Sequence, residues 1–262
     1  MRERDFFASV LSIFTFLMVL FGRLASKPVV HTYHYPASTI VTKAMSNSNN
    51  NNVLPKSILC FGDSLTAGTS PPRMENYPYA PHLERLLRER YSWNVVVHHV
   101  GYPGWTSGAL LSELPRLPDN PPAVAILLAG TNDLAYETDP SKIVGSIVQL
   151  HEACHQQGIP HTVAIAIPPS GYQSQYPQAA ELAATVNQQL AQYCHQKQQQ
   201  RQQQRLPTSS SFVEFPFAFD RQDERWSPDG LHFAPIGYQS LAESLAPIVA
   251  DILAGQQQHQ QQ

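Results

Sequence analysis

The feature of this chain that most constrains its fold is the alternation of short apolar runs with amphipathic helical patterns. The apolar runs occupy residues 57–61, 95–97, 123–129, 163–167 and 212–215. Runs this short and without a polar face are typical of strands that are covered on both sides. Apolar residues with helical spacing follow four of them, namely Leu83, Leu86 and Leu87; Ile143, Ile147, Leu150 and Cys154; Leu182, Val186, Leu190 and Tyr193; and Leu241, Leu245, Ile248 and Ile252. This order predicts an α/β fold in which helices cover both faces of a parallel sheet.

Composition excludes several classes of protein. Hydrophobic residues make up 42% of the 262 residues and charged residues only 14%, which favours a globular domain over a disordered chain. The formal net charge is -3 and there is no basic block, so we expect no nucleic-acid partner. The three cysteines, Cys60, Cys154 and Cys194, lie far apart without CxxC spacing, which argues against a zinc knuckle or a redox pair.

The N-terminus has the pattern of a targeting segment. Arg2 and Arg4 precede an apolar run at residues 6–21. As a helix this run would reach about 24 Å, short of the roughly 30 Å hydrocarbon core of a bilayer. We expect residues 1–26 to be a signal peptide or an uncleaved signal anchor, and Arg23 leaves both open because it interrupts the cleavage pattern. The predicted location is the secretory pathway, with the protein either secreted or attached to a membrane through this segment.

Low-complexity stretches divide the rest of the chain. Residues 27–55, which include an asparagine-rich stretch, are predicted to be a disordered linker before a folded domain at 56–254. A glutamine-rich insertion at 196–205 and a glutamine-rich tail at 255–262 are expected to be solvated. Neither stretch can bury enough apolar surface to offset the entropy that ordering it would cost.

The motifs with the most chemical content stand at the predicted strand ends, where ligands bind in parallel α/β sheets. The four blocks are Gly62-Asp63-Ser64-Leu65, Gly101 to Thr106, Gly130-Thr131-Asn132-Asp133, and Asp229-Gly230-Leu231-His232 before the last helix. A lone Gly-Asp-Ser is weak evidence, whereas four blocks in this order are a specific signature. Over about residues 56–254 the chain resembles the GDSL or SGNH hydrolase family, which is named for its Ser, Gly, Asn and His.

That resemblance implies a fold and a reaction. The implied fold is a flavodoxin-like, three-layer α/β/α sandwich with a central parallel sheet of about five strands. The implied reaction is hydrolysis of a small-molecule carboxylic ester, with neither a cofactor nor a metal. Ser64 would be the nucleophile, His232 the base that takes its proton, and Asp229 the carboxylate that orients the imidazole. Asp229 stands three residues before His232, so both side chains can share one face of a turn.

The resemblance also implies an oxyanion site, because negative charge develops on the carbonyl oxygen during attack. Its donors would be the backbone N–H of Ser64, the backbone N–H of Gly104 and the side chain of Asn132. Gly104 is preferred because it stands two residues before Thr106, and Gly101 is expected only to allow a turn. Trp105 departs from the small or polar residue that is usual at its position.

Aspartates 63 and 133, which neighbour the predicted site residues, have a plainer interpretation. We interpret Asp63 and Asp133 as residues that hold turns. Each residue of the predicted site would also suit a structural role if it stood alone. A non-catalytic member of the family that binds an ester or a glycan is therefore an alternative, although no residue of the catalytic set is missing.

A second motif predicts different chemistry. Residues 151–161 fit the pattern HExxHxxGxxH, in which three histidines bind zinc and a glutamate acts as base in metalloproteases. No methionine follows Met74, although these proteases need a methionine turn downstream. Gly158 is already explained as a helix stop, and a strand at 163–167 would draw His161 away from the helix. The metalloprotease is therefore kept only as an alternative.

Specificity is not readable from these motifs. The same scaffold serves esterases, thioesterases, deacetylases and acyltransferases. Tyr172 and Tyr176 follow the fourth predicted strand and either line the substrate pocket or cover it. Cys154 and Cys194 end helices that flank this strand, so both helices should lie on one face and the two thiols could pair in an oxidising compartment.

Overall fold

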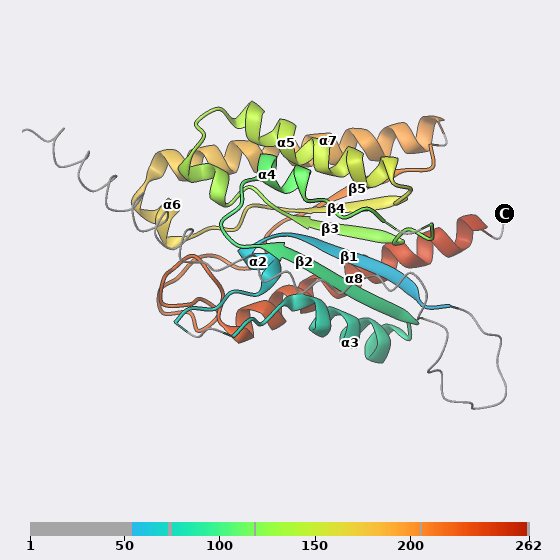
Figure 1. Cartoon of the computed structure of the whole chain (residues 1–262), viewed down its shortest axis with the longest axis horizontal. Coiled ribbons are helices and arrows are strands. Elements are labelled where there is room, and N and C mark those ends of the chain that lie inside the picture. Colours follow the sequence, from blue (N-terminus) through green and yellow to red (C-terminus); the bar gives the residue numbers. More distant parts are fainter. Residues whose placement is uncertain (1–53, 73–74, 118, 205, 261–262) are drawn as a thin grey trace, which may run out of the picture.

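A parallel sheet of five strands forms the centre of the computed structural model, which describes residues 54–72, 75–117, 119–204 and 206–260 (Figure 1). The strands are β1 (Lys56–Asp63), β2 (Val95–Tyr102), β3 (Val124–Leu128), β4 (His161–Ile165) and β5 (Ser209–Val213). Their order across the sheet is β2-β1-β3-β4-β5, and every neighbouring pair is parallel. The chain first steps from β1 to β2 and then to β3 on the other side, so the direction of winding changes between β1 and β3. Ligands bind at such switch points in open α/β sheets.

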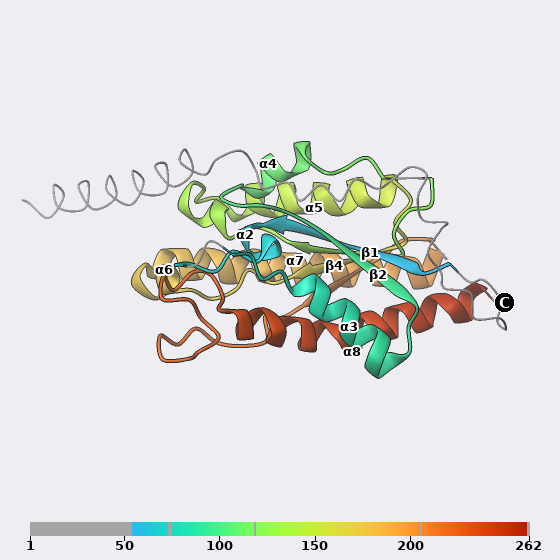
Figure 2. The ribbon, with the colours of Figure 1, turned by 60° about the horizontal axis from the view of Figure 1, so that its bottom comes forward.

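Helices cover both faces of the sheet, as predicted. One face carries α3 (Tyr79–Tyr91) and α8 (Pro235–Gln260), which pack against each other. The opposite face carries α4 (Ser107–Ser112), α5 (Pro140–Gln156) and α7 (Pro177–Gln204), with α5 in contact with both of its neighbours. Figures 1 and 2 show these two helical layers on either side of the strands. The short elements α2 (Ser64–Ala67), η1 (Asn132–Ala135) and α6 (Gly171–Gln175) follow strand ends.

The core explains why the strands read as continuous apolar runs. In β1, Ile58 and Cys60 pack into the cluster beneath α3 and α8, whereas Leu59 and Phe61 pack into the cluster beneath α5 and α7. All four side chains are buried. Successive residues of a strand point to opposite faces, so a strand covered on both sides has no polar position. The predicted three-layer sandwich is thus confirmed.

The two cysteines that could have paired are not joined by a disulfide. Cys154 on α5 and Cys194 on α7 are both free and buried, as is Cys60 on β1. The expectation that the two helices share a face is confirmed by the contacts between α5 and α7. A shared face is necessary for pairing, but the side chains must also point toward each other at disulfide distance.

The glutamine-rich stretches are helical extensions rather than separate insertions. Helix α7 continues to Gln204 and α8 continues to Gln260, past Gly255. Most of the added side chains are solvated, as expected. Glutamine has a good helix propensity, and extending an existing helix avoids the cost of nucleation. In the tail, the Gln256 side chain also donates to the Ala123 carbonyl at 2.9 Å, which ties this end of α8 to the start of β3.

The predicted targeting segment lies outside the described residues. This applies to all of residues 1–26 and to nearly all of the predicted linker at 27–55. Among the residues that the structure does describe, no helix has the length and apolar character needed to cross a membrane.

Candidate active site

The predicted nucleophile stands at a tight junction between β1 and α2. Strand β1 ends at Asp63 and the helix begins at Ser64, while the Asp63 side chain caps it by accepting from the Leu65 N–H at 2.9 Å. Gly101 on β2 lies against this helix, and a Cβ there would collide with the Ala67 backbone. The expectation that Gly101 allows a turn is therefore wrong. Its missing side chain lets the helix that carries Ser64 pack closely against β2.

The other half of the site is the histidine loop, residues 226–233, which lies before α8. An antiparallel bridge between Trp226 and Phe233 closes this loop, and the Ser227 N–H donates to the His232 carbonyl at 2.9 Å. Inside the loop, one carboxylate oxygen of Asp229 accepts from the Leu231 and His232 N–H groups, both at 3.0 Å. These bonds fix the backbone of His232 independently of the contacts that its ring makes.

Ser64, Asp229 and His232 come together through the His232 ring. Its Nδ1 lies 2.6 Å from the second Asp229 oxygen, and its Nε2 lies 2.9 Å from Ser64 Oγ, across 168 residues of sequence. A carboxylate can only accept, so Nδ1 carries the proton and Nε2 is left to accept from the Ser64 hydroxyl. Partial burial alone would raise the pKa of Asp229, but the hydrogen bond and charge of His232 and the two backbone N–H groups lower it below its ordinary value. The carboxylate is thus held in its charged form.

The loop and the nucleophile are held to each other by contacts that sequence reasoning missed. Ser227 is buried, and its hydroxyl donates to the Phe233 carbonyl at 3.0 Å and lies 3.3 Å from the Ser70 hydroxyl. Tyr238 at the start of α8 donates to the Thr69 carbonyl at 2.6 Å. Both contacts join the histidine side of the site to the segment that follows the nucleophile.

An aromatic cluster packs against the histidine loop. It consists of Phe215, Phe217, Phe219, Trp226, Phe233 and Tyr238, with successive ring centroids 4.6–6.3 Å apart. Trp226 and Phe233 are the two residues of the bridge that closes the loop. The only sequence signal for this cluster is the spacing of phenylalanine at every second position after β5. Packing of this density limits the positions that the His232 backbone can adopt.

The predicted oxyanion donors lie on loops that meet beside the nucleophile. Asn132 is the first residue of η1, and its Nδ2 donates to the Trp105 carbonyl at 2.9 Å. The same nitrogen lies 3.5 Å from the Asp63 carboxylate, which directly precedes Ser64. Gly104 is exposed and has φ of +82°, a left-handed conformation that favours glycine. The structure therefore brings the segments of Ser64, Gly104 and Asn132 together.

The departure at Trp105 is accommodated without disturbing this arrangement. Its ring packs against Tyr102 with centroids 5.0 Å apart and contacts the core beneath α5 and α7. Its backbone carbonyl accepts from Asn132. The unusual side chain packs against the core, and the hydrogen-bonding group is one that any residue would supply.

The two aspartates interpreted as turn residues have different roles. Asp63 is fully buried; burial raises its pKa to about 7, although its bond from the Leu65 N–H acts in the opposite direction. It holds the turn that follows it, as predicted. Asp133 reaches instead to Ser107, 26 residues earlier, and accepts from its N–H at 2.8 Å and its hydroxyl at 2.6 Å. No local sequence pattern identifies Ser107 as the partner of Asp133, because the contact joins two segments that follow different strands.

The histidines of the HExxHxxGxxH run bond to hydroxyl groups of β4 and β5, and His151 and His155 both contact Thr162. His151 Nδ1 bonds to Thr162 at 2.7 Å, His155 Nε2 lies 3.2 Å from Ser210 Oγ, and His161 Nε2 lies 2.8 Å from Ser211 Oγ. His161 lies on β4, as the strand prediction required. In the described part of the chain, no group of three or more His, Cys, Asp and Glu residues could hold a metal ion. The glutamate of the motif is equally engaged, because Glu152 pairs with Lys197 at 2.6 Å.

These histidines predict a loss of stability in acid. Burial lowers the pKa of His151 to about 3 and that of His161 to about 4. Below about pH 6.5 the unfolded chain binds protons that the folded chain does not, so the free energy of unfolding falls as pH decreases. We expect the advantage of the wild type over His151→Gln to shrink by about 1.4 kcal/mol for each pH unit below pH 6.

Urea denaturation between pH 7.5 and pH 4.5 measures this difference. Comparing the two proteins cancels the other groups that titrate in this range, Asp63 among them. His195→Gln, at an exposed histidine of α7, serves as the control and should follow the wild type. Parallel curves for wild type and His151→Gln would contradict a buried neutral imidazole.

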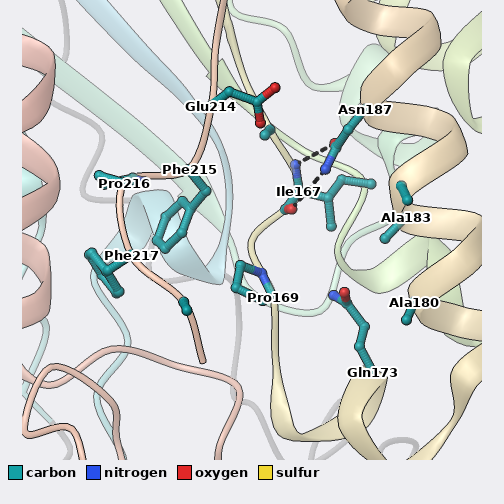
Figure 3. A pocket seen from close by; sticks show the side chains of 13 residues that line it. Ile167, Pro169, Gln173, Ala180, Ala183, Asn187, Glu214, Phe215, Pro216 and Phe217 are labelled. Carbon is teal, nitrogen blue, oxygen red and sulfur yellow. Dashed lines mark hydrogen bonds between the residues drawn. The ribbon is translucent and has the colours of Figure 1, made fainter. Parts of the chain in front are cut away.

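A separate pocket lies at the carboxyl ends of β4 and β5 (Figure 3). It is bounded by α7 and by the segment 214–218, and its walls include Ile167, Pro169, Gln173, Asn187, Phe215 and Phe217. The amide of Asn187 is bonded to both the N–H and the carbonyl of Ile167, at 2.8 and 3.1 Å. Ser64, Asp229 and His232 are not among the residues that line this pocket.

The two tyrosines expected near the substrate do not line this pocket either. Tyr172 on α6 and Tyr176 just after it place their rings 4.8 Å apart, and Tyr172 packs on the core beneath α5 and α7. The start of α6 is tied to the histidine loop, because the Gly171 N–H donates to the Gly230 carbonyl at 2.7 Å. A role of the tyrosines toward substrate stays a prediction.

Comparison with known proteins decides the family. The model of the GDSL-like lipase/acylhydrolase family matches residues 60–240, which include all four motif blocks. The chain belongs to this family. It is therefore a hydrolase of a family that cleaves esters, and its candidate site occupies the strand ends that the motif blocks predicted. No curated protein matches the sequence.

Solved structures agree with the fold of a GDSL-like hydrolase. A lipase/acylhydrolase from Enterococcus faecalis is 20% identical, with 75% of this chain and 96% of that chain covered and a TM-score of 0.51. A carbohydrate acetylesterase family member from Sinorhizobium meliloti is 17% identical, with 76% and 99% covered and a TM-score of 0.53. A carbohydrate esterase family 3 protein from Talaromyces cellulolyticus is 15% identical, with 76% and 99% covered and a TM-score of 0.55. At these identities the likeness establishes the shared fold.

Proposed function

We propose that this chain hydrolyses small-molecule carboxylic esters through an acyl-enzyme formed on Ser64. The observation that carries the proposal is the position of the His232 ring, 2.9 Å from Ser64 Oγ on one side and 2.6 Å from Asp229 on the other. A serine hydroxyl is a weak nucleophile until an adjacent base accepts its proton. Family membership supports ester hydrolysis in general, and this geometry supports the catalytic set Ser64, His232 and Asp229.

In the first half of the reaction, Ser64 attacks the ester carbonyl. The hydroxyl proton passes to His232 Nε2 while Oγ bonds to the carbonyl carbon and an oxyanion forms. The N–H groups of Ser64 and Gly104 and the Asn132 amide are the proposed donors to that oxyanion. When the intermediate collapses, the alcohol leaves with the proton from His232 and the acyl group stays on Ser64.

In the second half, water replaces the alcohol. His232 takes a proton from the water as it attacks the acyl carbon, and the proton returns to Ser64 Oγ when the carboxylic acid leaves. Asp229 remains a carboxylate throughout, because its lowered pKa reflects stabilisation of the charged form. These steps use only side chains and backbone groups of this chain.

An inhibition experiment with purified protein tests the proposal. A serine-directed fluorophosphonate should abolish hydrolysis of p-nitrophenyl acetate and add its mass to the peptide that contains Ser64. EDTA or 1,10-phenanthroline should leave the activity unchanged. Inhibition by the chelators without a phosphonate adduct would instead favour the metalloprotease alternative, and absence of both activity and adduct would favour the non-catalytic one.

A second set of assays, with substrates of different classes, identifies the substrate class. p-Nitrophenyl esters of increasing acyl length, an acyl thioester and a peracetylated sugar distinguish esterase, thioesterase and deacetylase activity. Addition of a competing alcohol, with analysis of the transferred acyl group, reports acyltransferase activity. The proposal of ester hydrolysis requires turnover of at least one oxygen ester.

We also propose, from the sequence alone, that residues 1–26 direct the chain to the secretory pathway. The support is the charged start followed by the apolar run at 6–21. N-terminal sequencing of the protein recovered from its native source distinguishes a cleaved signal peptide from a retained membrane anchor. Recovery of the intact chain in a soluble intracellular fraction would contradict the proposal.

A further inference from the structure

Three hydrogen bonds join the segment after β2 to the segment after β3. Asn132 Nδ2 donates to the Trp105 carbonyl at 2.9 Å, and Ser107 donates to the two oxygens of Asp133, from its N–H at 2.8 Å and its hydroxyl at 2.6 Å. Asn132 and Asp133 begin η1, and Ser107 begins α4. The first segment contains the Gly104 amide and the second contains the Asn132 side chain.

We propose that Asp133, acting through Ser107, is a positioning residue that holds the Gly104 amide and the Asn132 side chain at one oxyanion site. This inference rests on the proposed function and deepens it. It assigns no contact between Asp133 and the substrate. The contribution of Asp133 is to keep two donors on separate loops at a constant distance from each other.

The topology of the sheet explains why such a connection is needed. Strands β2 and β3 are not neighbours, because β1 lies between them. No ladder hydrogen bond therefore sets the position of one strand end relative to the other. Gly104 adds no packing of its own, since it is exposed and has nothing within 4 Å of the place where a Cβ would stand. Without a link between the loops, the two donors would move independently.

The chemistry of the link suits this role. Asp133 and Ser107 are buried, and both carboxylate oxygens are used, so the pair has one geometry. The Ser107 N–H belongs to the first turn of α4, where helix amides have no partner within the helix. A carboxylate there accepts a charge-assisted bond, stronger than a neutral one. The link therefore resists displacement when charge develops on the substrate.

The Asn132 amide is left with one hydrogen for the substrate. Its Nδ2 carries two N–H groups, and one of them is bound to the Trp105 carbonyl. The same nitrogen also contacts Asp63 at 3.5 Å, which is long for a hydrogen bond and holds the second hydrogen only weakly. The bond to Trp105 thus fixes the plane of the amide, and the Asp133–Ser107 pair fixes the loop that supplies Trp105.

Asp133→Asn tests the inference, because it keeps the shape of the side chain and replaces one acceptor oxygen by a donor. We expect kcat for p-nitrophenyl acetate to fall about 10- to 10²-fold with KM within about twofold, since small displacements of a catalytic group cost up to about 10²-fold. Ser107→Ala removes one of the two bonds and should lower kcat less. Asp139→Asn is the matched control, because Asp139 caps α5 on the same connection but is exposed and bonds only within its own turn.

A double-mutant cycle separates positioning from a general structural effect. If Asp133 acts through the oxyanion site, Asp133→Asn should lower kcat by a clearly smaller factor in the Asn132→Ala background than in the wild type, because only the Gly104 amide is then left to be positioned. Losses that multiply in the double variant, or an unchanged kcat in the single variant, would overturn the inference. If Asp133→Asn does not fold, Ser107→Ala in the same two backgrounds decides by the same criterion. Ser64→Ala keeps the two proposals apart: activity that survives it contradicts the proposed function, whereas an inactive Ser64→Ala beside a normal Asp133→Asn contradicts only this inference.

Discussion

Replacing Ser64 with alanine is expected to lower kcat for p-nitrophenyl ester hydrolysis by up to about 10⁶-fold. The alanine leaves the proposed oxyanion donors and the His232–Asp229 pair in place but removes the atom proposed to form the acyl-enzyme. Whatever rate remains must come from water attacking an ester that is only bound and polarised. Steady-state kinetics with purified protein, together with a thermal melt to confirm folding, measures the effect.

The control for Ser64→Ala is Ser112→Ala, at an exposed serine of α4 whose hydroxyl bonds only to the Ala109 carbonyl of the same helix. This variant should have the activity of the wild type. A Ser64→Ala protein that turns over the ester within tenfold of the wild-type rate would remove Ser64 from the mechanism. In that case the contact between His232 and Ser64 at 2.9 Å would be structural.

Replacing Asn132 with alanine should lower kcat by about 10²–10³-fold, the usual effect of losing one oxyanion donor. Such a donor bonds more strongly to the charged oxygen of the transition state than to the neutral carbonyl of the substrate. We therefore expect kcat and kcat/KM to fall together while KM changes little. The variant also frees the Trp105 carbonyl, so the measured loss includes any movement of that loop.

Asn120→Ala is the control for this second variant, since Asn120 is exposed and precedes the amino end of β3, opposite the site. It should leave both kinetic constants unchanged. An Asn132→Ala variant with normal kcat and a raised KM would indicate that Asn132 binds the substrate in its ground state. That result would remove it from the oxyanion site while leaving the Ser64 prediction intact.

Much of the fold was predictable because it depends on local patterns. Because the sheet is covered on both faces, β1 has buried residues at consecutive positions. It can therefore be identified as a strand from its own residues, without knowledge of its neighbours. Ile143, Ile147 and Leu150 recur with the period of a helix because α5 buries a single stripe. The glutamine-rich end of α7 is helical, which the sequence analysis did not predict. Low apolar content argued against order, but a helix already nucleated by Val186 and Leu190 can extend into solvent.

The parts of the site that were missed depend on contacts between distant segments. Asp133 was interpreted as a turn residue, and the identity of its partner Ser107 follows only from the meeting of two loops. Gly101 was assigned a turn, whereas its function is to let the Ala67 backbone approach β2. Cys154 and Cys194 lie on helices that do pack together, yet their thiols remain unpaired. In each case the residue type limited the roles that the residue could have, and the packing of distant segments decided which group it contacts.

The amino-acid sequence by itself determined which groups are available and at which strand ends they stand. Ser64, Asn132 and His232 follow or precede recognisable elements, and the Asp229-to-His232 spacing is short enough to be set by one turn of the chain. Only the tertiary structure decided that a serine and a histidine 168 residues apart would meet at 2.9 Å, and that Asp133 would link the segments after β2 and β3. The physical reason is that periodicity and turn chemistry act within a few residues. The distance between two strand ends, in contrast, is set by sheet order and by the close packing of every layer between them.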